Sequence, residues 1–162
     1  MLTLPSVLHR TVSLYGRRTA VYDRERDYTW AEFAERVRRA AGVLVALGVK
    51  PGRRFAVISR NSFRHAEINQ AGFWLGAVPV PVNHRLAPPE IRFILEDAEC
   101  QVVAVDDAFA DLVQTEELAP WRERMFWLTP GEVNADGPSY EALLADAEPV
   151  PRGDVDENDD AI

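Results

Sequence analysis

The chain has 162 residues, of which 47% are hydrophobic and 27% charged, and its formal net charge is −8. This length and composition predict one globular domain with a buried core and exclude a wholly disordered chain. The acidic balance and the lack of any RNA- or DNA-binding signature argue against a nucleic-acid partner. No apolar run reaches the roughly 18 residues of a membrane span, and no signal-peptide pattern is visible at the start.

Charge is distributed unevenly along the chain. Residues 1–95 carry 15 basic and 7 acidic side chains, whereas residues 96–162 carry 3 basic and 19 acidic ones. Two interpretations stay open: an anion-binding half with an acidic tail, or part of a larger surface whose remainder restores the balance. The single cysteine, Cys100, cannot form an internal disulfide, which suits a cytoplasmic location.

The sequence of the first third of the chain predicts a helix, a short hairpin and a second helix, in that order. Apolar residues at helical spacing indicate a helix over residues 4–15, and residues 19–22 and 27–29 are typical of paired strands. The next helix begins at Thr29, which forms a capping box with Glu32. The apolar stripe of this helix consists of Trp30, Phe33, Ala34, Val37, Ala41 and Leu44. Its expected solvent face consists of Glu32, Glu35, Arg36, Arg38 and Arg39.

Strand and helix patterns then alternate. The strand-like runs are 54–58, 78–82, 101–105 and 125–128, and the helical segments between them are 62–76, 88–98 and 106–118. Apolar strands separated by helices predict parallel pairing with helical crossovers. The expected fold class is therefore α/β: a doubly wound, mostly parallel sheet with helices on both faces.

Two prolines constrain the second of these strands. Pro79 and Pro81 are two residues apart, so their missing N–H groups face the same side and prevent a complete ladder there. This pattern predicts an edge strand, a bulge or an early strand end. The loop that follows, 83–86, would lie at the carboxyl end of the sheet, where ligands usually bind in this fold class.

Turn signals mark the last part of the chain. Proline and glycine recur at 130–131 and 136–138, and Ser139–Ala147 is typical of a short helix. We predict an α/β subdomain over residues 1–147 and an acidic linker over residues 148–162 that leads towards a further strand. A disordered acidic tail is the alternative.

Most catalytic signatures are absent. The nine glycines form no phosphate-binding loop, and Lys50 lies in a turn. Ser59 follows a strand but lacks the neighbouring glycines of a nucleophile elbow. Cys100 is typical of a small buried core residue rather than of a nucleophile. The three histidines, His9, His65 and His84, have no metal-ligand spacing.

Two loops are candidates by position. Asn61 follows the first strand of the sheet and leads into a helix, where free N–H groups could attract an anion, although Asn61 or Ser62 could equally cap that helix. Asn83 and Arg85 follow the second strand. Arg85 could bind an anion or could hold the next helix through Glu90.

The ordered set of segments resembles the opening of AMP-forming acyl-CoA synthetases and their adenylating relatives, which include luciferases and peptide-synthetase adenylation domains. The resemblance covers about residues 5–128. It rests on runs 28–33 (YTWAEF), 47–54 (LGVKPGRR), 57–62 (VISRNS), 76–86 (GAVPVPVNHRL) and 89–98.

The resemblance implies the incomplete N-terminal part of the large domain of an acid–CoA ligase. Such an enzyme would use ATP, Mg²⁺ and CoA to convert a fatty or aryl carboxylic acid, through an acyl-adenylate, into its thioester. Its partners would be the rest of the large domain and a C-terminal domain. The family's Ser/Thr/Gly-rich loop, adenine-binding stretch, metal ligands and mobile-domain lysine match no stretch here. No catalytic residue is carried over, and the segment alone is expected to be inactive.

Two alternatives stay open beside this reading. The chain could be a stand-alone, non-catalytic interaction module that retains the early part of the fold. Alternatively, it could belong to an adenylation domain that loads a carrier protein.

Overall fold

The computed structural model describes residues 3–23, 26–128, 137–156 and 158–160. Its helices are α1 Leu4–Tyr15, α2 Trp30–Ala46, α3 Phe63–Leu75, α4 Pro88–Asp97, α5 Ala110–Val113 and α6 Tyr140–Asp146, with 3-10 segments η1 Asp107–Phe109 and η2 Glu116–Arg124. Its strands are β1 Thr19–Val21, β2 Tyr28–Thr29, β3 Arg54–Ile58, β4 Val78–Pro81, β5 Val103–Val105 and β6 Met125–Trp127. The predicted fold class is confirmed.

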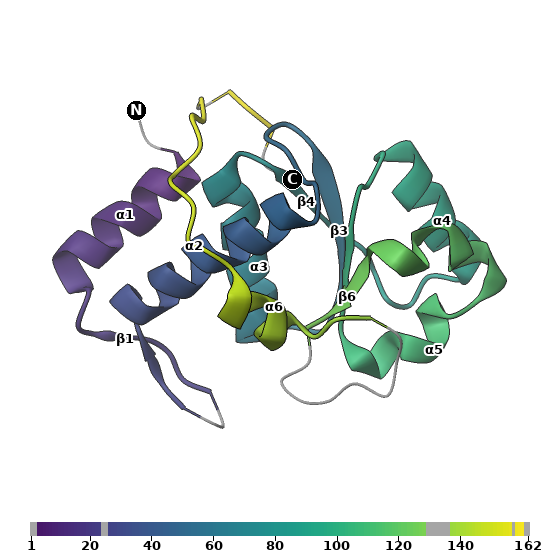
Figure 1. Cartoon of the computed structure of the whole chain (residues 1–162), viewed down its shortest axis with the longest axis horizontal. Helices are drawn as coiled ribbons and strands as arrows, with labels where there is room; N and C mark the ends of the chain where they lie inside the picture. Colours follow the sequence, from purple (N-terminus) through teal and green to yellow (C-terminus); the bar gives the residue numbers. More distant parts are fainter. Residues whose placement is uncertain (1–2, 24–25, 129–136, 157, 161–162) are drawn as a thin grey trace.

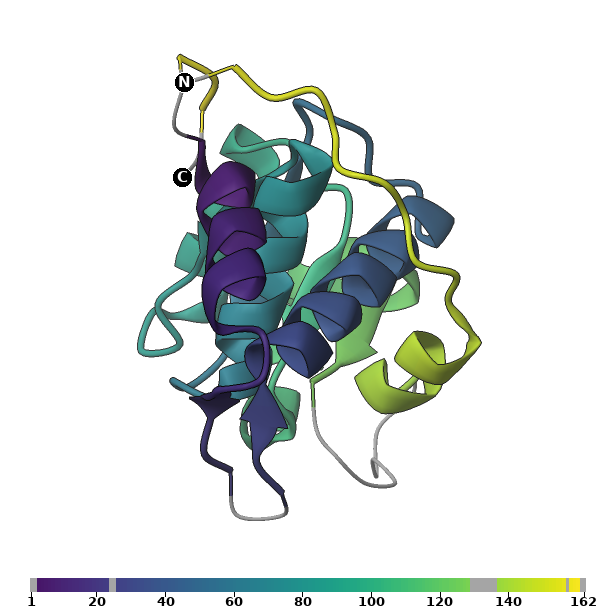
Figure 2. The same cartoon turned by 90° about the vertical axis from the view of Figure 1, so that its left-hand side faces the viewer.

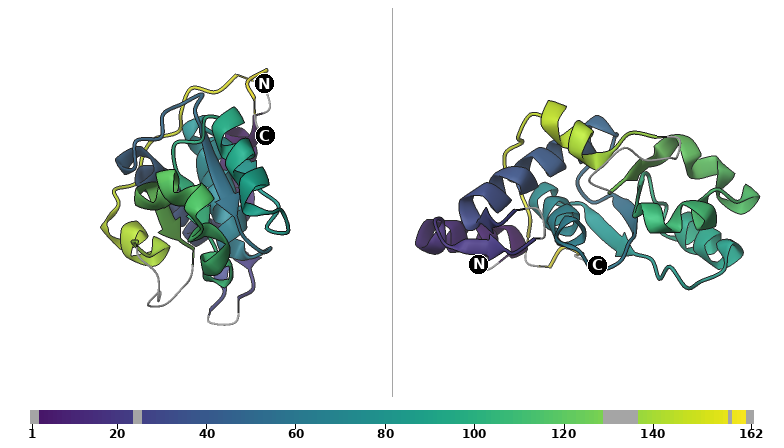
Figure 3. Two further views of the ribbon diagram at one scale, coloured as in Figure 1. Left: turned by 90° about the vertical axis from the view of Figure 1, so that its right-hand side faces the viewer. Right: turned by 90° about the horizontal axis from the view of Figure 1, so that it is seen from below.

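Four parallel strands form the central sheet in the order β4-β3-β5-β6, and β1 and β2 form a separate antiparallel hairpin. Helices α1, α2, α3 and α6 lie on one side of this sheet, and α4 and α5 lie on the other (Figures 1 and 3). The side chains along each strand alternate between two cores because successive residues point to opposite faces. In β3, for example, Phe55 and Val57 join the α2–α3 core, whereas Ala56 and Ile58 join the α4 core.

The edge position of β4 follows from its prolines, as predicted. The N–H groups of Val78 and Val82 donate to the carbonyl oxygens of Arg53 and Val57, each at 2.9 Å. Alternation along the strand therefore turns Pro79 and Pro81 to the open side, where no ladder is lost.

Helix α2 begins as its capping box predicts. The Glu32 N–H donates to the Thr29 hydroxyl at 3.2 Å, and the Thr29 N–H donates to the Glu32 carboxylate at 2.8 Å. We expect Thr29→Ala to lower the free energy of unfolding by about 1 kcal/mol, because it leaves an N–H group at the helix start unpaired. Urea denaturation measures this change. Thr29→Ser, which keeps the hydroxyl, should retain most of the stability, and equal losses in both variants would contradict the capping role.

The predicted helix over 106–118 is wrong. The segment is broken into η1, α5 and the start of η2, with departures from helical geometry at Phe109 (φ −115°, ψ 18°) and Thr115 (φ −73°, ψ 160°). The Arg122 guanidinium compensates for the second break by donating to the carbonyls of Gln114 and Thr115 at 2.7 and 3.2 Å. Local apolar spacing does not reveal this tertiary contact.

Beyond α6, residues 148–156 run along α2 and α3 (Figure 2). The division of the chain at residue 147 stays a prediction. The predicted turns at 130–131 and at residue 136 lie outside the described residues. No helix in the described part of the chain is both long and apolar enough to cross a bilayer.

Candidate functional site

The carboxyl edge of the sheet is the candidate site because the strand order reverses there. From β3 the chain crosses to β4 on one side, whereas from β5 it crosses to β6 on the other. The connections thus diverge between β3 and β5, and in open α/β sheets this divergence leaves a crevice for ligands. The loops that border it are 59–62, 82–87 and 106–109.

A charged pair joins the loops on the two sides of this divergence. The Arg60 guanidinium lies 3.6 Å from the Asp106 carboxylate, and the Asp106 N–H donates to the Ile58 carbonyl at 2.9 Å. Partial burial raises the pKa of Asp106, but a hydrogen bond from the Ala108 N–H and the charge of Arg60 outweigh burial and hold this pKa below its usual value. Asp106 is therefore ionised at neutral pH.

A ring contact joins the loops after β4 and β5. The His84 imidazole stacks on the Phe109 ring with a centroid distance of 4.4 Å and an interplanar angle of 19°. The Asn83 side-chain oxygen accepts from the Arg85 N–H at 3.0 Å, which shapes the turn that presents His84. The sequence predicts this loop but gives no sign that Phe109 is its partner.

The three predicted site residues all lie at this edge. Asn61 is exposed in the loop after β3, and Asn83 and Arg85 are exposed in the loop after β4. Helix α3 is capped by Ser62, whose hydroxyl accepts from the His65 N–H at 3.1 Å, so Asn61 is not the cap. Glu90 accepts from the Ala87 N–H at 2.8 Å. Glu90 thus caps α4 through a backbone N–H group, and both predicted roles of Arg85 stay predictions.

A largely buried polar cluster joins helices α2, α3 and α6. Arg36 of α2 lies between two carboxylates: its Nε and Nη2 donate to Glu67 of α3 at 2.7 and 3.0 Å, and its Nη1 and Nη2 donate to Glu141 of α6 at 3.1 and 3.0 Å. The Tyr140 hydroxyl donates to Glu67 at 2.6 Å, and Arg64 donates to Glu141 at 2.7 Å.

This cluster corrects the prediction that Arg36 lies on a solvent face. The Glu67 side chain is 0% exposed and that of Arg36 only 16%. Burial raises the pKa of Glu67 more than Arg36 and the Tyr140 hydrogen bond lower it. Burial acts in the same direction on Glu141, but there the two arginines prevail and its pKa falls. In the sequence, the burial of Glu67 is indicated only by its position directly before the apolar residue Ile68.

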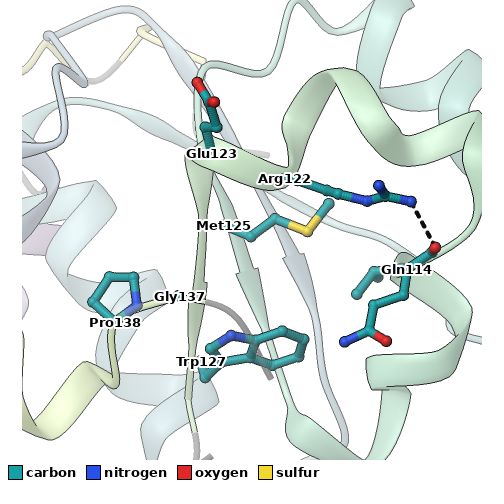
Figure 4. Close-up of a pocket in the computed structure, with 8 residues that line it drawn as sticks. Gln114, Arg122, Glu123, Met125, Trp127, Gly137 and Pro138 are labelled. Atoms are coloured by element: carbon teal, nitrogen blue, oxygen red, sulfur yellow. Dashed lines mark hydrogen bonds between the residues drawn. The ribbon is translucent and has the colours of Figure 1, made fainter. Parts of the chain in front are cut away.

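A separate groove of about 620 Å³ lies along the outer edge of β6 (Figure 4). Met125 and Trp127 form its apolar floor, and Arg122 lies at its rim. That arginine already donates to the carbonyls that end α5. Among the described residues, no group of three or more His, Cys, Asp or Glu side chains could hold a metal ion.

Comparison with known proteins decides the family. The model of the AMP-binding enzyme family matches residues 8–161, nearly the whole chain. The chain belongs to the AMP-binding enzyme family. The fold class predicted from the sequence and the resemblance to adenylating enzymes are thereby confirmed.

Within this family the chain is similar to acid-activating ligases. It is 39% identical over 117 residues to a long-chain-fatty-acid–CoA ligase of Thermus thermophilus, covering 70% of this chain and 22% of that ligase. It is 32% identical over 135 residues to the fatty acid–[acyl-carrier-protein] ligase ScoC of Streptomyces coeruleorubidus, covering 82% and 24%.

A solved structure shows the same fold. The benzoate CoA ligase of Burkholderia xenovorans superposes with a TM-score of 0.85 at 24% identity, covering 99% of this chain and 32% of that enzyme. The chain thus spans about a quarter or less of the length of the two sequence relatives and about a third of the solved ligase.

Proposed function

We propose that the chain is the N-terminal portion of an ATP-dependent acid–CoA ligase. In the reaction, a carboxylate oxygen attacks the α-phosphorus of ATP, which forms an acyl-adenylate and expels pyrophosphate. The thiol of CoA then attacks the acyl carbonyl carbon, loses its proton and expels AMP. The observation that supports this proposal best is the family match over residues 8–161 together with the two fatty-acid-activating relatives.

In this enzyme, the segment would position the loops at the carboxyl edge of the sheet. Asn61, Asn83 and Arg85 are the candidates for contact with a substrate anion, because their side chains are exposed there on neighbouring loops. We assign no catalytic role to any residue of the segment. A fatty acid is the favoured substrate and an aryl acid the alternative.

The described residues do not fit a complete site for ATP and Mg²⁺. Arg60 already pairs with Asp106 where the connections diverge, and among the described residues no group of three or more His, Cys, Asp or Glu side chains could hold a metal ion. Phosphate binding by a loop also needs clustered glycines, which the sequence lacks. The groups that handle ATP, Mg²⁺ and CoA would therefore lie in the rest of the large domain and in a C-terminal domain, in a cytoplasmic enzyme.

Pyrophosphate exchange tests the proposal. The product of the complete reading frame should incorporate labelled pyrophosphate into ATP when a fatty acid is present, whereas residues 1–162 alone should give no exchange above background. Exchange by the segment alone would contradict the assignment of the catalytic groups to further chain. A folded, complete product that is inactive with both fatty and aryl acids would contradict the ligase proposal.

The acceptor distinguishes a second candidate. The similarity to the ScoC ligase favours an enzyme that passes the acyl group to a carrier protein. In the same assay mixture, thioester formation on CoA supports the first candidate, and thioester formation only on the phosphopantetheine arm of a carrier protein supports the second.

A further inference from the structure

Residues 147–156, called the strap below, cross the outer surface of α2 and α3 in an extended conformation. They return the chain from α6 towards the amino edge of the sheet, where the Asp160 carboxylate lies 3.8 Å from the Arg54 guanidinium (Figure 2). Most of the strap side chains are exposed. Ala147 and Val150 are partly buried and pack against the hydrophobic core, so the attachment combines a small apolar contact with a few hydrogen bonds.

Two groups of hydrogen bonds attach the strap to the helix layer. The first is on α2, where the Val150 N–H donates to the Arg38 carbonyl at 3.2 Å and Arg39 donates to the Ala147 carbonyl at 2.9 Å. Gly42 permits this approach, because a Cβ atom at that position would overlap the carbonyl oxygen of Glu148. A glycine within a helix costs about 1 kcal/mol relative to alanine, and here it gives the strap direct access to the helix backbone.

The second group is at the C-terminal end of α3. The Gly153 N–H donates to the Trp74 carbonyl at 2.9 Å, and the Trp74 indole N–H donates to the Val150 carbonyl at 3.0 Å. A Cβ atom at Gly153 would lie 2.5 Å from the carbonyl oxygen of Leu75. Both attachments thus require a glycine at the point of contact, one on α2 and one on the strap.

Two prolines stiffen the strap around Val150, which takes part in both attachments. Pro149 and Pro151 flank Val150, so their φ angles are fixed and Val150 has the only N–H group of the three. A stiff segment cannot leave one attachment and remain aligned with the other. Segments with few buried contacts also open at a lower free energy than the core does.

We propose that the strap docks and undocks as one unit, and that its release frees the C-terminal end of α6 and exposes Trp74 while the sheet stays folded. Gly42 and Gly153 are the two positions that permit docking. The strap is then a segment of the helix layer that can open locally without unfolding of the sheet.

Native-state hydrogen exchange of the 162-residue chain, followed by NMR, tests this proposal. The amides of Val150 and Gly153 should exchange through one common opening, at least about tenfold faster than the Ala56 amide, which donates to the Val102 carbonyl in the sheet. Strap amides that exchange only with global unfolding, at the Ala56 rate, would overturn the proposal.

Reciprocal variants test the coupling. Gly153→Ala should accelerate exchange at Val150, and Gly42→Ala should accelerate it at Gly153, each by about tenfold or more, with Ala56 unchanged. Acceleration confined to the nearer amide would show two independent contacts and would also overturn the proposal.

Two further variants keep the test decisive if an alanine disturbs folding. Trp74→Phe adds no atom and removes the indole donor, so it should accelerate exchange at both amides. Pro151→Gly should instead uncouple the two amides, because it removes the stiff connection. Arg152→Ala, a change at an exposed strap position, is the matched control and should leave all three amides unaffected.

Discussion

Replacing Arg36 by methionine should lower the free energy of unfolding by about 3–5 kcal/mol, because it leaves the carboxylate of Glu67 buried without its cation. Glu67 is 0% exposed and receives two hydrogen bonds from Arg36. Urea denaturation at about pH 7 measures the loss. Arg38→Met is the matched control: Arg38 is on the same helix but pairs with Glu35 at the surface, so its loss should cost less than about 1 kcal/mol.

The pH dependence of this loss identifies its cause. Burial already raises the pKa of Glu67, and removal of Arg36 should raise it further. A group with a raised folded-state pKa favours the folded state in its protonated form, so the penalty of Arg36→Met should shrink as the pH falls towards about 5. The double variant Arg36→Met/Glu67→Met should regain much of the stability. A loss independent of pH and not recovered in the double variant would mean that packing, not the unpaired charge, is responsible.

Phe55→Ala should be comparably destabilising, by about 3–5 kcal/mol, because the Phe55 side chain on β3 is fully buried in the core. Its ring lies directly below α3 at Gly72, where an added Cβ atom would lie 2.7 Å from the ring. Gly72→Ala alone should therefore also destabilise the fold, despite the better helix propensity of alanine.

The effect of Gly72→Ala on the free energy of unfolding should change sign when Phe55 is also replaced. In the Phe55→Ala background the two closest contacts of an added Cβ atom are gone and only Pro79 Cδ, at 3.3 Å, stays near it, so Gly72→Ala should become stabilising by up to roughly 1 kcal/mol. A complete double-mutant cycle by urea denaturation measures this coupling. If Gly72→Ala destabilises both backgrounds equally, the close packing of α3 on β3 at this position is not what determines stability there.

Much of the fold is predictable because its signals are local. The capping box of Thr29 and Glu32 gives the start of α2, and the alternation of apolar runs gives the parallel sheet. Pro79 and Pro81 indicate an edge strand because a missing N–H group is a property of the residue itself. The same reasoning places Asn61, Asn83 and Arg85 at one edge of the sheet before any contact is known.

The features that were missed depend on partners distant in the sequence. Arg36 is on the boundary of the apolar stripe of α2, and its burial results from Glu67 and Glu141, which are 31 and 105 residues away. The break within 106–118 is stabilised by Arg122, and Phe109 acquires its partner from the preceding loop at His84. Helical periodicity reports which face of a segment is apolar, but not which polar side chains find a buried partner.

The proposal that this chain begins an acid–CoA ligase is tested most directly by sequencing the coding DNA beyond the codon for Ile162. We predict an in-frame continuation that soon encodes a Ser/Thr/Gly-rich loop ending in Pro-Lys-Gly, followed by enough chain to complete the large domain and a C-terminal domain. A stop codon immediately after Ile162 would contradict the proposal and would favour a non-catalytic module that retains the family's fold.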